Sequence, residues 1–108
     1  MAKKIPKKIN NAVREYVQIL ERDVPVEKAI IYGSWAKGFA NKKSDIDLAI
    51  VSSSFKDLHE AGKYLCRKLW EVKSPIEPVP YSPKSFREKK TSPILAEIRK
   101  YGISVNLL

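Results

Sequence analysis

The sequence predicts one domain of the α/β (α+β) class, in which helices pack on a small mixed β-sheet. Strand-like apolar runs alternate with helical patterns in the order α-β-short α-β-α-β-α-α-β. A long helical segment joins the second and third strands, which predicts a right-handed crossover and a parallel pair. The connection between the first two strands is short and favours an antiparallel pair. A length of 108 residues predicts a single domain over residues 1–108, with one modest core.

The first helix is predicted over residues 6–22, where apolar residues recur at spacings of three and four: Ile9, Val13, Tyr16 and Leu20. Residues 28–33 are β-branched and apolar, so a short buried strand is expected there, ending at Gly33. We expect one helical turn over residues 34–37 and a basic loop over residues 39–44.

The second strand is predicted over residues 45–51, where apolar side chains alternate with a side that carries two aspartates. Residues 55–72 have an apolar stripe at helical spacing, and the serines at 52–54 offer an N-cap. We predict the third strand at residues 76–81, although this segment holds two prolines. The prolines are two positions apart, so their missing N–H groups lie on one edge, which favours an edge strand.

The last third of the chain predicts two helices and a strand. Residues 83–90 are expected to form a short basic helix, and residues 93–101 a final helix with proline in its first turn. Gly102 is the expected C-terminal stop of that helix. Residues 103–107 are predicted to form the last strand.

The chain carries a formal net charge of +9. Such an excess attracts polyanions, which include nucleic acid, triphosphates and acidic proteins, although lysine clusters are also common on solvated surfaces. Residues 1–8 are interpreted as a flexible basic arm. Cys66 is the only cysteine, which excludes an intrachain disulfide and a cysteine zinc site and favours a reducing, cytoplasmic location. No apolar run approaches the roughly 18 residues that a membrane span requires.

The most informative motif is Gly33-Ser34, followed after ten residues by Asp45-Ile46-Asp47. Two aspartates at alternate strand positions project from one face, about 6.5 to 7 Å apart along the chain. Carboxylate oxygens at this spacing can share Mg²⁺ ions, and a pair of metals needs one more carboxylate. Glu77 is the candidate, because the parallel crossover would place its strand beside residues 45–51.

The Gly-Ser pair predicts an anion-binding turn close to these carboxylates. In an antiparallel pair, the end of the first strand lies beside the start of the second, so Gly33 and Ser34 should approach Asp45. Gly33 allows a phosphate to approach the backbone, and Ser34 can cap the next helical turn, whose free N–H groups bind anions. Either motif alone is weak, because Asp-x-Asp is often a polar pair and Gly-Ser a simple turn. Their combination predicts a site for a metal-bound nucleoside triphosphate.

These residues resemble the minimal nucleotidyltransferase branch of the DNA polymerase β-like superfamily. The motif matches its Gly-Ser, ten residues, Asp-x-Asp pattern, and similarity extends over residues 31–38, 44–48 and 81–103, within about residues 26–105. The resemblance implies the nucleotidyltransferase fold, Mg²⁺ at both aspartates and a nucleotide phosphate at the Gly-Ser turn. Members transfer a nucleoside monophosphate from ATP or another NTP to a hydroxyl and release pyrophosphate. Their third carboxylate is usually aspartate, where this chain has Glu77.

The resemblance is strongest to the MntA-like antitoxin branch of the family. It implies a small all-helical HEPN protein as partner, and AMP transfer to that partner. Because Glu77 replaces the usual aspartate, a second hypothesis is a non-catalytic antitoxin that covers its partner. A third is a basic nucleic-acid-binding module, which ranks last because no aromatic–basic RNA signature accompanies the charge.

Five residues near the motif leave two interpretations open. Lys37, Lys42 and Lys43 can contact a triphosphate or remain surface lysines. Trp35 and Phe39 can stack on a base or pack in the ordinary way.

Overall fold

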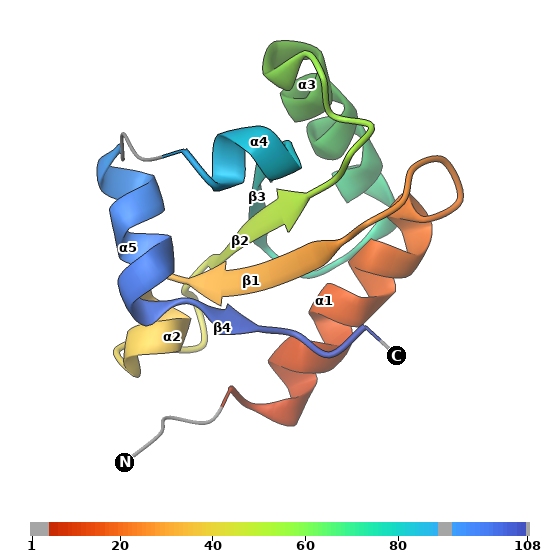
Figure 1. Ribbon diagram of the computed structural model, residues 1–108. Helices are drawn as coiled ribbons and strands as arrows, with labels where there is room; N and C mark the ends of the chain where they lie inside the picture. Colours follow the sequence, from red (N-terminus) through yellow and green to blue (C-terminus); the bar gives the residue numbers. More distant parts are fainter. Residues whose placement is uncertain (1–4, 89–91, 108) are drawn as a thin grey trace.

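The computed structural model describes residues 5–88 and 92–107, which form a mixed four-stranded sheet with helices on both faces (Figure 1). The strands are β1 (Lys28–Tyr32), β2 (Ile46–Val51), β3 (Ile76–Tyr81) and β4 (Ile103–Ser104). The helices are α1 (Lys7–Leu20), α2 (Ser34–Lys37), α3 (Leu58–Lys68), α4 (Pro83–Phe86) and α5 (Pro93–Tyr101), with a 3₁₀ turn η1 (Leu69–Glu71). Of the predicted arm over residues 1–8, residues 1–4 lie outside the described part, whereas α1 already includes Lys7 and Lys8.

The strand order β3-β2-β1-β4 confirms the mixed sheet that the sequence predicts. β1 and β2 are antiparallel, and Tyr32 pairs with Asp47 at the end of β1. β2 and β3 are parallel, and α3 makes the crossover between them. β4 adds to the free edge of β1 in antiparallel orientation. One end of the sheet therefore brings together the end of β1 and the starts of β2 and β3.

The main core lies on the face that α1 and α3 cover. It is built from alternate residues of β1 and β2, among them Ile31, Leu48 and Ile50, and from the apolar stripes of the two helices. Tyr16 of α1 is buried, and its hydroxyl donates a hydrogen bond to the Leu65 carbonyl of α3 at 2.7 Å. The predicted helical periodicity of residues 6–22 thus points at this core.

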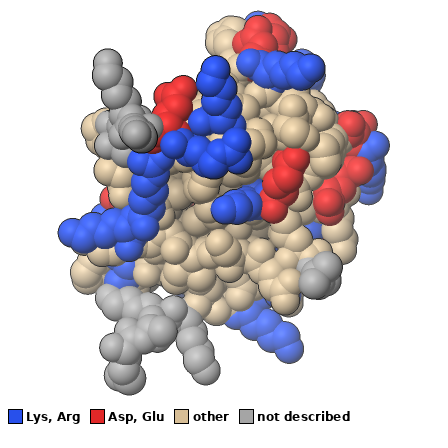
Figure 2. All heavy atoms as spheres, in the orientation of Figure 1, with Lys and Arg blue, Asp and Glu red and all other residues tan. Residues whose placement is uncertain are grey.

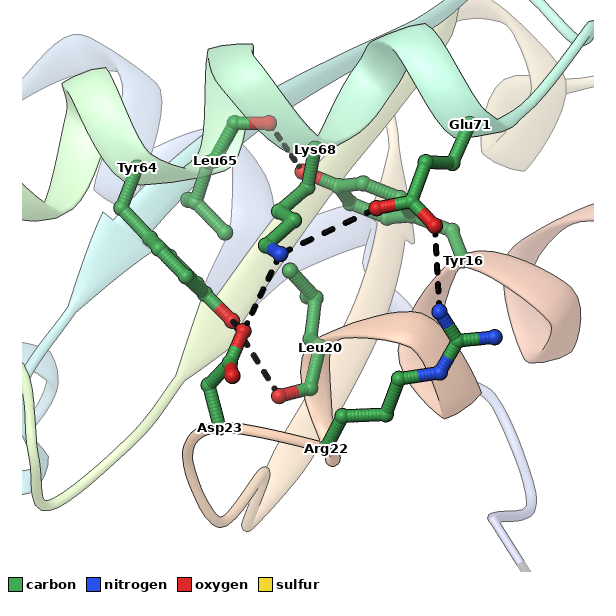
Figure 3. A network of polar contacts seen from close by, with 8 residues as sticks. All are labelled: Tyr16, Leu20, Arg22, Asp23, Tyr64, Leu65, Lys68 and Glu71. Carbon is green, nitrogen blue, oxygen red and sulfur yellow. Dashed lines mark hydrogen bonds and ion pairs between the residues drawn. The ribbon is translucent and has the colours of Figure 1, made fainter.

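Polar side chains close the same helix pair at its rim (Figure 3). The Tyr64 hydroxyl donates to Asp23 Oδ2 at 2.9 Å, and Lys68 Nζ lies 3.2 Å from the same oxygen. Arg22 and Glu71 form an ion pair at 3.1 Å. These contacts fix the end of α1 against α3 and η1, on the face away from the predicted site.

A smaller cluster lies on the second face, under α4 and α5. Its buried members are Ile30, Tyr32, Ala49 and Ile98, with Val79, Tyr81 and Phe86 partly buried beside them. α5 contacts β1, and α4 contacts β3. Lys and Arg side chains gather over α4 and α5 (Figure 2). Asp47 and Glu77 belong to this second face by alternation along their strands.

β3 forms at the sheet edge despite Pro78 and Pro80, as predicted. Ile46 donates its N–H to the Pro75 carbonyl at 2.7 Å, and Ser52 donates to the Tyr81 carbonyl at 3.0 Å. The backbone groups of odd-numbered residues therefore face β2, and both prolines lie at positions whose N–H would face outward.

Some boundaries differ from the sequence expectation. α3 begins at Leu58 and not near residue 55, because the N-cap is Asp57, whose carboxylate accepts from the His59 and Glu60 N–H groups. Ser52 to Ser54 form a separate turn in which the Ser54 N–H donates to the Ser52 hydroxyl at 3.1 Å. α3 and η1 together end at Glu71.

The C-terminal part is also shorter in regular structure than predicted. α4 ends at Phe86, β4 has two residues, and residues 89–90 of the expected basic helix lie outside the described part. Gly102 ends α5 as expected, but its φ of −60° is not left-handed. A Cβ there would collide with the Ile98 carbonyl oxygen and lie 2.6 Å from Ile30 Cγ2, so the end of α5 and its packing on β1 both require glycine. No described helix is long and apolar enough to cross a membrane.

Candidate active site

The turn after β1 is built on Gly33, which has a φ of +72°. The Gly33 carbonyl accepts from the Lys37 N–H at 3.0 Å, so the chain passes directly from β1 into α2. Gly33 itself is the N-cap of α2, and no side chain caps the turn. The expectation that the Ser34 hydroxyl caps this helix is therefore wrong: Ser34 is its first residue. The first N–H groups of α2 have no partner within the helix, as at every helix start.

Gly33 also lies directly against the carboxylate of Asp47. Because Tyr32 pairs with Asp47, the turn begins beside that residue. A Cβ built on Gly33 would collide with Asp47 Oδ2 and would approach its Cγ to 3.0 Å. The structure thus joins the predicted phosphate turn to the predicted metal carboxylate, and it leaves no room for a side chain between them.

The three predicted carboxylates lie at the same end of the sheet. Asp47 and Glu77 are register partners on neighbouring strands and share a face. Asp47 is half-buried and Glu77 is exposed. Asp45 is exposed and precedes β2, which begins at Ile46, so it does not lie within the strand as predicted.

Electrostatic repulsion connects these carboxylates. Burial raises the pKa of Asp47, and the charges of Glu97 and Asp45 raise it further, although a hydrogen bond with Glu77 opposes the change. The pKa of Glu77 is also raised, first by desolvation and then by the nearby Asp45 and Asp47. Burial, with the charge of Asp47, raises the pKa of Tyr32 to about 12. Negative charge at this end of the sheet is therefore unfavourable without a cation.

The donor set suits a hard divalent cation, but it is not assembled as a three-ligand centre. Within residues 5–88 and 92–107, no group of three His, Cys, Asp or Glu residues is close enough to hold a metal ion. Asp47 and Glu77 offer adjacent oxygens from two strands, with Asp45 just outside them. Carboxylates whose pKa is raised by burial and then by neighbouring charges fit Mg²⁺, which binds through one or two carboxylates and completes its shell with phosphates and water.

A family model of the nucleotidyltransferase domain matches residues 13–104. The chain belongs to the nucleotidyltransferase domain family. The match includes the turn, all three carboxylates and α5, and it confirms the family and the transferase class that the motif predicts. A comparison with curated protein sequences found no match.

Solved structures with this nucleotidyltransferase fold are similar to the chain at low sequence identity. A toxin–antitoxin complex crystallised with AMP-PNP aligns with a TM-score of 0.60 and 21% identity, over 89% of this chain and 71% of that one. A structure from Sulfolobus solfataricus, described as a nucleotidyltransferase, gives 0.63 and 17%, over 90% and 78%. A variant of the toxin–antitoxin MntA–HpeT gives 0.58 and 18%, over 89% and 71%. At these identities the likeness establishes the fold.

The candidate site of this nucleotidyltransferase domain has a neighbour that the sequence analysis missed, Glu97 on α5. Its Oε1 lies 2.5 Å from the Nζ of Lys37, the last residue of α2. The same ammonium lies 5.0 Å from the ring centre of Tyr101. Glu97 belongs to no local motif, and only the spacing of Glu97 and Tyr101, four residues apart on one helix face, offered a signal. Lys37 is thus set apart from Lys42 and Lys43, which are exposed loop residues.

The two aromatic residues near the nucleotidyltransferase motif have different environments. Trp35 packs against the main core, and its indole N–H donates to the Ser44 carbonyl at 3.3 Å. It also lines a hollow of about 370 Å³ beside α1, on the first face. The packing interpretation therefore holds for Trp35. Phe39, just beyond α2, is 76% exposed.

Proposed function

We propose that this chain is an Mg²⁺-dependent nucleotidyltransferase that transfers AMP from ATP to a hydroxyl acceptor. The proposal rests above all on one observation: strand register places Asp47 against the Gly33 turn on one side and beside Glu77 on the other. A phosphate-binding turn and a carboxylate pair in direct contact are what a metal-bound triphosphate requires.

Each residue has a role in this proposal. Asp45, Asp47 and Glu77 would hold the divalent ions, and the N–H groups after Gly33, with the Ser34 hydroxyl, would bind phosphate oxygens. Lys37 lies three residues after Ser34, on the same face of α2, and would contact the same phosphates. Bound there, Mg²⁺ would supply positive charge that neutralises the triphosphate and its leaving group.

The reaction is a substitution at the α-phosphorus of ATP. The acceptor oxygen forms a bond to this phosphorus while the bond to the bridging oxygen breaks, and pyrophosphate leaves. Glu77 is the exposed member of the carboxylate pair, so the oxygen that it does not use for metal would take the acceptor's proton. Asp47 is half-buried beside the turn and would act as a metal ligand throughout the reaction.

We further propose an antitoxin role, with a small all-helical HEPN protein as acceptor and partner. The similar folds include a toxin–antitoxin with AMP-PNP and the toxin–antitoxin MntA–HpeT. The basic surface over α4 and α5 suits an acidic partner surface (Figure 2). ATP as substrate and a single reduced Cys66 agree with a cytoplasmic location.

The test is transfer of label from α-labelled ATP to the candidate partner in the presence of Mg²⁺. We expect transfer by the wild type, loss of transfer in EDTA, and background transfer by the Asp45→Asn/Asp47→Asn double variant. Equal transfer by the double variant, or none by the wild type with partner and Mg²⁺ present, would refute the proposal.

A non-catalytic antitoxin is the second candidate, favoured by the exposed Glu77 and by the absence of a three-ligand group within the described residues. It predicts that the Asp45→Asn/Asp47→Asn variant neutralises the partner as fully as the wild type. The nucleic-acid hypothesis instead predicts RNA binding whose affinity falls steeply with salt and is unchanged in that variant.

A further inference from the structure

We infer that Glu97 is a positioning residue of the nucleotide site, which acts by holding the Lys37 ammonium where it meets the phosphates. The inference rests on the proposed function and adds a residue from α5 to a site otherwise built on β1, α2, β2 and β3. Its basis is the contact that joins α2 to α5 beside the carboxylates.

The contact has the geometry of a held side chain. Lys37 Nζ lies 2.5 Å from Glu97 Oε1 and 5.0 Å from the Tyr101 ring centre, so a carboxylate and an aromatic face share one ammonium. The two charged side chains are 30% and 33% exposed, which leaves one side of the pair open to a ligand. An ammonium has three donors in different directions, so one that is bonded to a carboxylate can also bond to phosphate oxygens when a ligand arrives.

Glu97 is itself carried by a fixed element. Leu95 and Ile98 bury α5 against the sheet, and Gly102 packs on Ile30 of β1. The Arg99 guanidinium donates to the Phe86 carbonyl at 3.0 Å, which ties α5 to α4. A carboxylate on such a helix can hold a flexible lysine in one conformation before the ligand arrives, which reduces the entropy lost on binding.

The position of the pair agrees with a role at the phosphates. Lys37 is the last residue of the four-residue helix α2, whose N-cap Gly33 lies against the Asp47 carboxylate, so the same turn holds the ammonium and the proposed phosphate site. Protein kinases use the same logic, where a glutamate on a helix orients the lysine that contacts the nucleotide phosphates. The shared feature is a lysine that needs a partner on a second element.

The effect of the Glu97 charge and a positioning role for Glu97 predict opposite changes in ATP affinity when this residue is neutralised, so the inference can be tested. Glu97 is negative and lies near the proposed phosphates, so its neutralisation should tighten ATP binding if only net charge matters. If Glu97 positions Lys37, its neutralisation should weaken ATP binding, because the lysine then loses its held conformation.

The experiment compares Glu97→Gln, Lys37→Met, the double variant and Glu97→Asp with the wild type. The readouts are KM and kcat for ATP in the transfer assay, and the Kd of a non-hydrolysable ATP analogue with Mg²⁺. We expect Lys37→Met to raise KM and Kd by about tenfold or more and Glu97→Gln by roughly threefold to tenfold, with kcat little changed. The double variant should match Lys37→Met alone, because both changes remove one interaction. Glu97→Asp should recover part of the loss.

Lys100→Met is the matched control. Lys100 lies on α5, the helix of Glu97, and its Nζ is 5.3 Å from the same Tyr101 ring, whereas the ion pair of Glu97 is with Lys37. The Lys100→Met variant removes one positive charge, as Lys37→Met does, and should leave the Kd of the ATP analogue within about twofold of the wild type.

Two failures are distinguishable. If the wild type transfers label and Lys37→Met weakens binding, but Glu97→Gln binds as well as the wild type or more tightly, the inference is wrong and the proposed function stands. If the wild type neither binds the analogue nor transfers label, the proposed function itself fails. Thermal unfolding of each variant checks folding. Where Glu97→Gln is unstable, Glu97→Ala, which also removes the carboxylate, decides by the same criterion.

Discussion

The glycine at position 33 meets two separate requirements. Its φ of +72° is unfavourable for other residues, and its missing Cβ is where Asp47 places its carboxylate. Either requirement alone would favour glycine. Together they mean that the phosphate turn and the carboxylate can approach each other only through this residue.

Gly33→Ala should therefore destabilise the fold, by about 1–3 kcal/mol, through backbone strain and displacement of Asp47. Gly62 is the matched control, since it lies within α3 and has nothing within 4 Å of a built Cβ. Gly62→Ala should stabilise the protein by up to about 1 kcal/mol through helix propensity. Urea unfolding measures both changes, and two changes of the same sign would contradict this account of position 33.

The raised pKa of Asp47 predicts a pH-dependent cost in stability. The folded protein retains a proton at Asp47 that the unfolded chain loses from about pH 4 upward, so Asp47 costs stability as pH rises through the interval up to its folded pKa. Asp47→Asn should thus unfold at a higher temperature than the wild type at neutral pH, and the difference should vanish near pH 3. Thermal unfolding in EDTA measures this. An equal gain at every pH would assign the effect to packing.

At the level of elements, β3 shows how an edge strand can tolerate two prolines. Pro78 and Pro80 lie where their missing N–H groups face away from β2, so the ladder to β2 is intact. The outer edge therefore lacks two donors that another strand could use. On the inner edge, the pairing of β3 with β2 places Glu77 beside Asp47.

A Pro78→Val/Pro80→Val variant should restore these two donors and with them a strand edge open to pairing. We expect stability close to that of the wild type but increased self-association at high concentration. Sedimentation velocity over a range of concentrations measures it, with a Pro83→Ala variant at the start of α4 as control. A variant that sediments like the wild type and the control at every concentration would show that the prolines have no such role.

Sequence patterns predicted the elements better than their ends. The apolar runs predicted the strands, and the lengths of the connections predicted the antiparallel β1–β2 pair and the parallel β2–β3 pair. The start of α3 did not, because Ser52 to Ser54 and Asp57 all offer N-cap oxygens, and only the burial of Phe55 ahead of the helix decides between them. The Ser34 cap failed for a similar reason: Gly33 already holds the N-cap position.

At the level of the whole molecule, the larger core and the candidate site lie on opposite faces of the sheet. The α1–α3 face carries the larger core and the polar rim of Figure 3, whereas the carboxylates and the phosphate turn belong to the opposite face and its end. The turn and two carboxylates were predictable because a local motif encodes them. Glu97 was not, because only the packing of α5 on β1 brings it there.

Tyr16→Phe tests this separation. The variant loses the buried hydrogen bond to the Leu65 carbonyl and should cost about 1 kcal/mol of unfolding free energy. The Kd for an ATP analogue should remain unchanged, because the contact lies on the other face. Cys66→Ser, at an exposed position next to Leu65, is the control and should change neither quantity. A loss of nucleotide affinity in Tyr16→Phe would show that the two faces are coupled.

The hydrogen bond from the Trp35 indole to the Ser44 carbonyl has a consequence for insertions and deletions in the chain. It closes a loop that is also bonded internally, since Asn41 and Ser44 exchange backbone and side-chain hydrogen bonds of 2.9 and 3.0 Å. Most surface loops tolerate changes in length. The loop between Trp35 and Ser44 should not, because one residue more or fewer would break the Trp35–Ser44 hydrogen bond or move Asp45 away from the turn. The length of the ten-residue interval between Ser34 and Asp45 is thus set by these contacts. Insertions and deletions should be tolerated far less here than in the turn before β1.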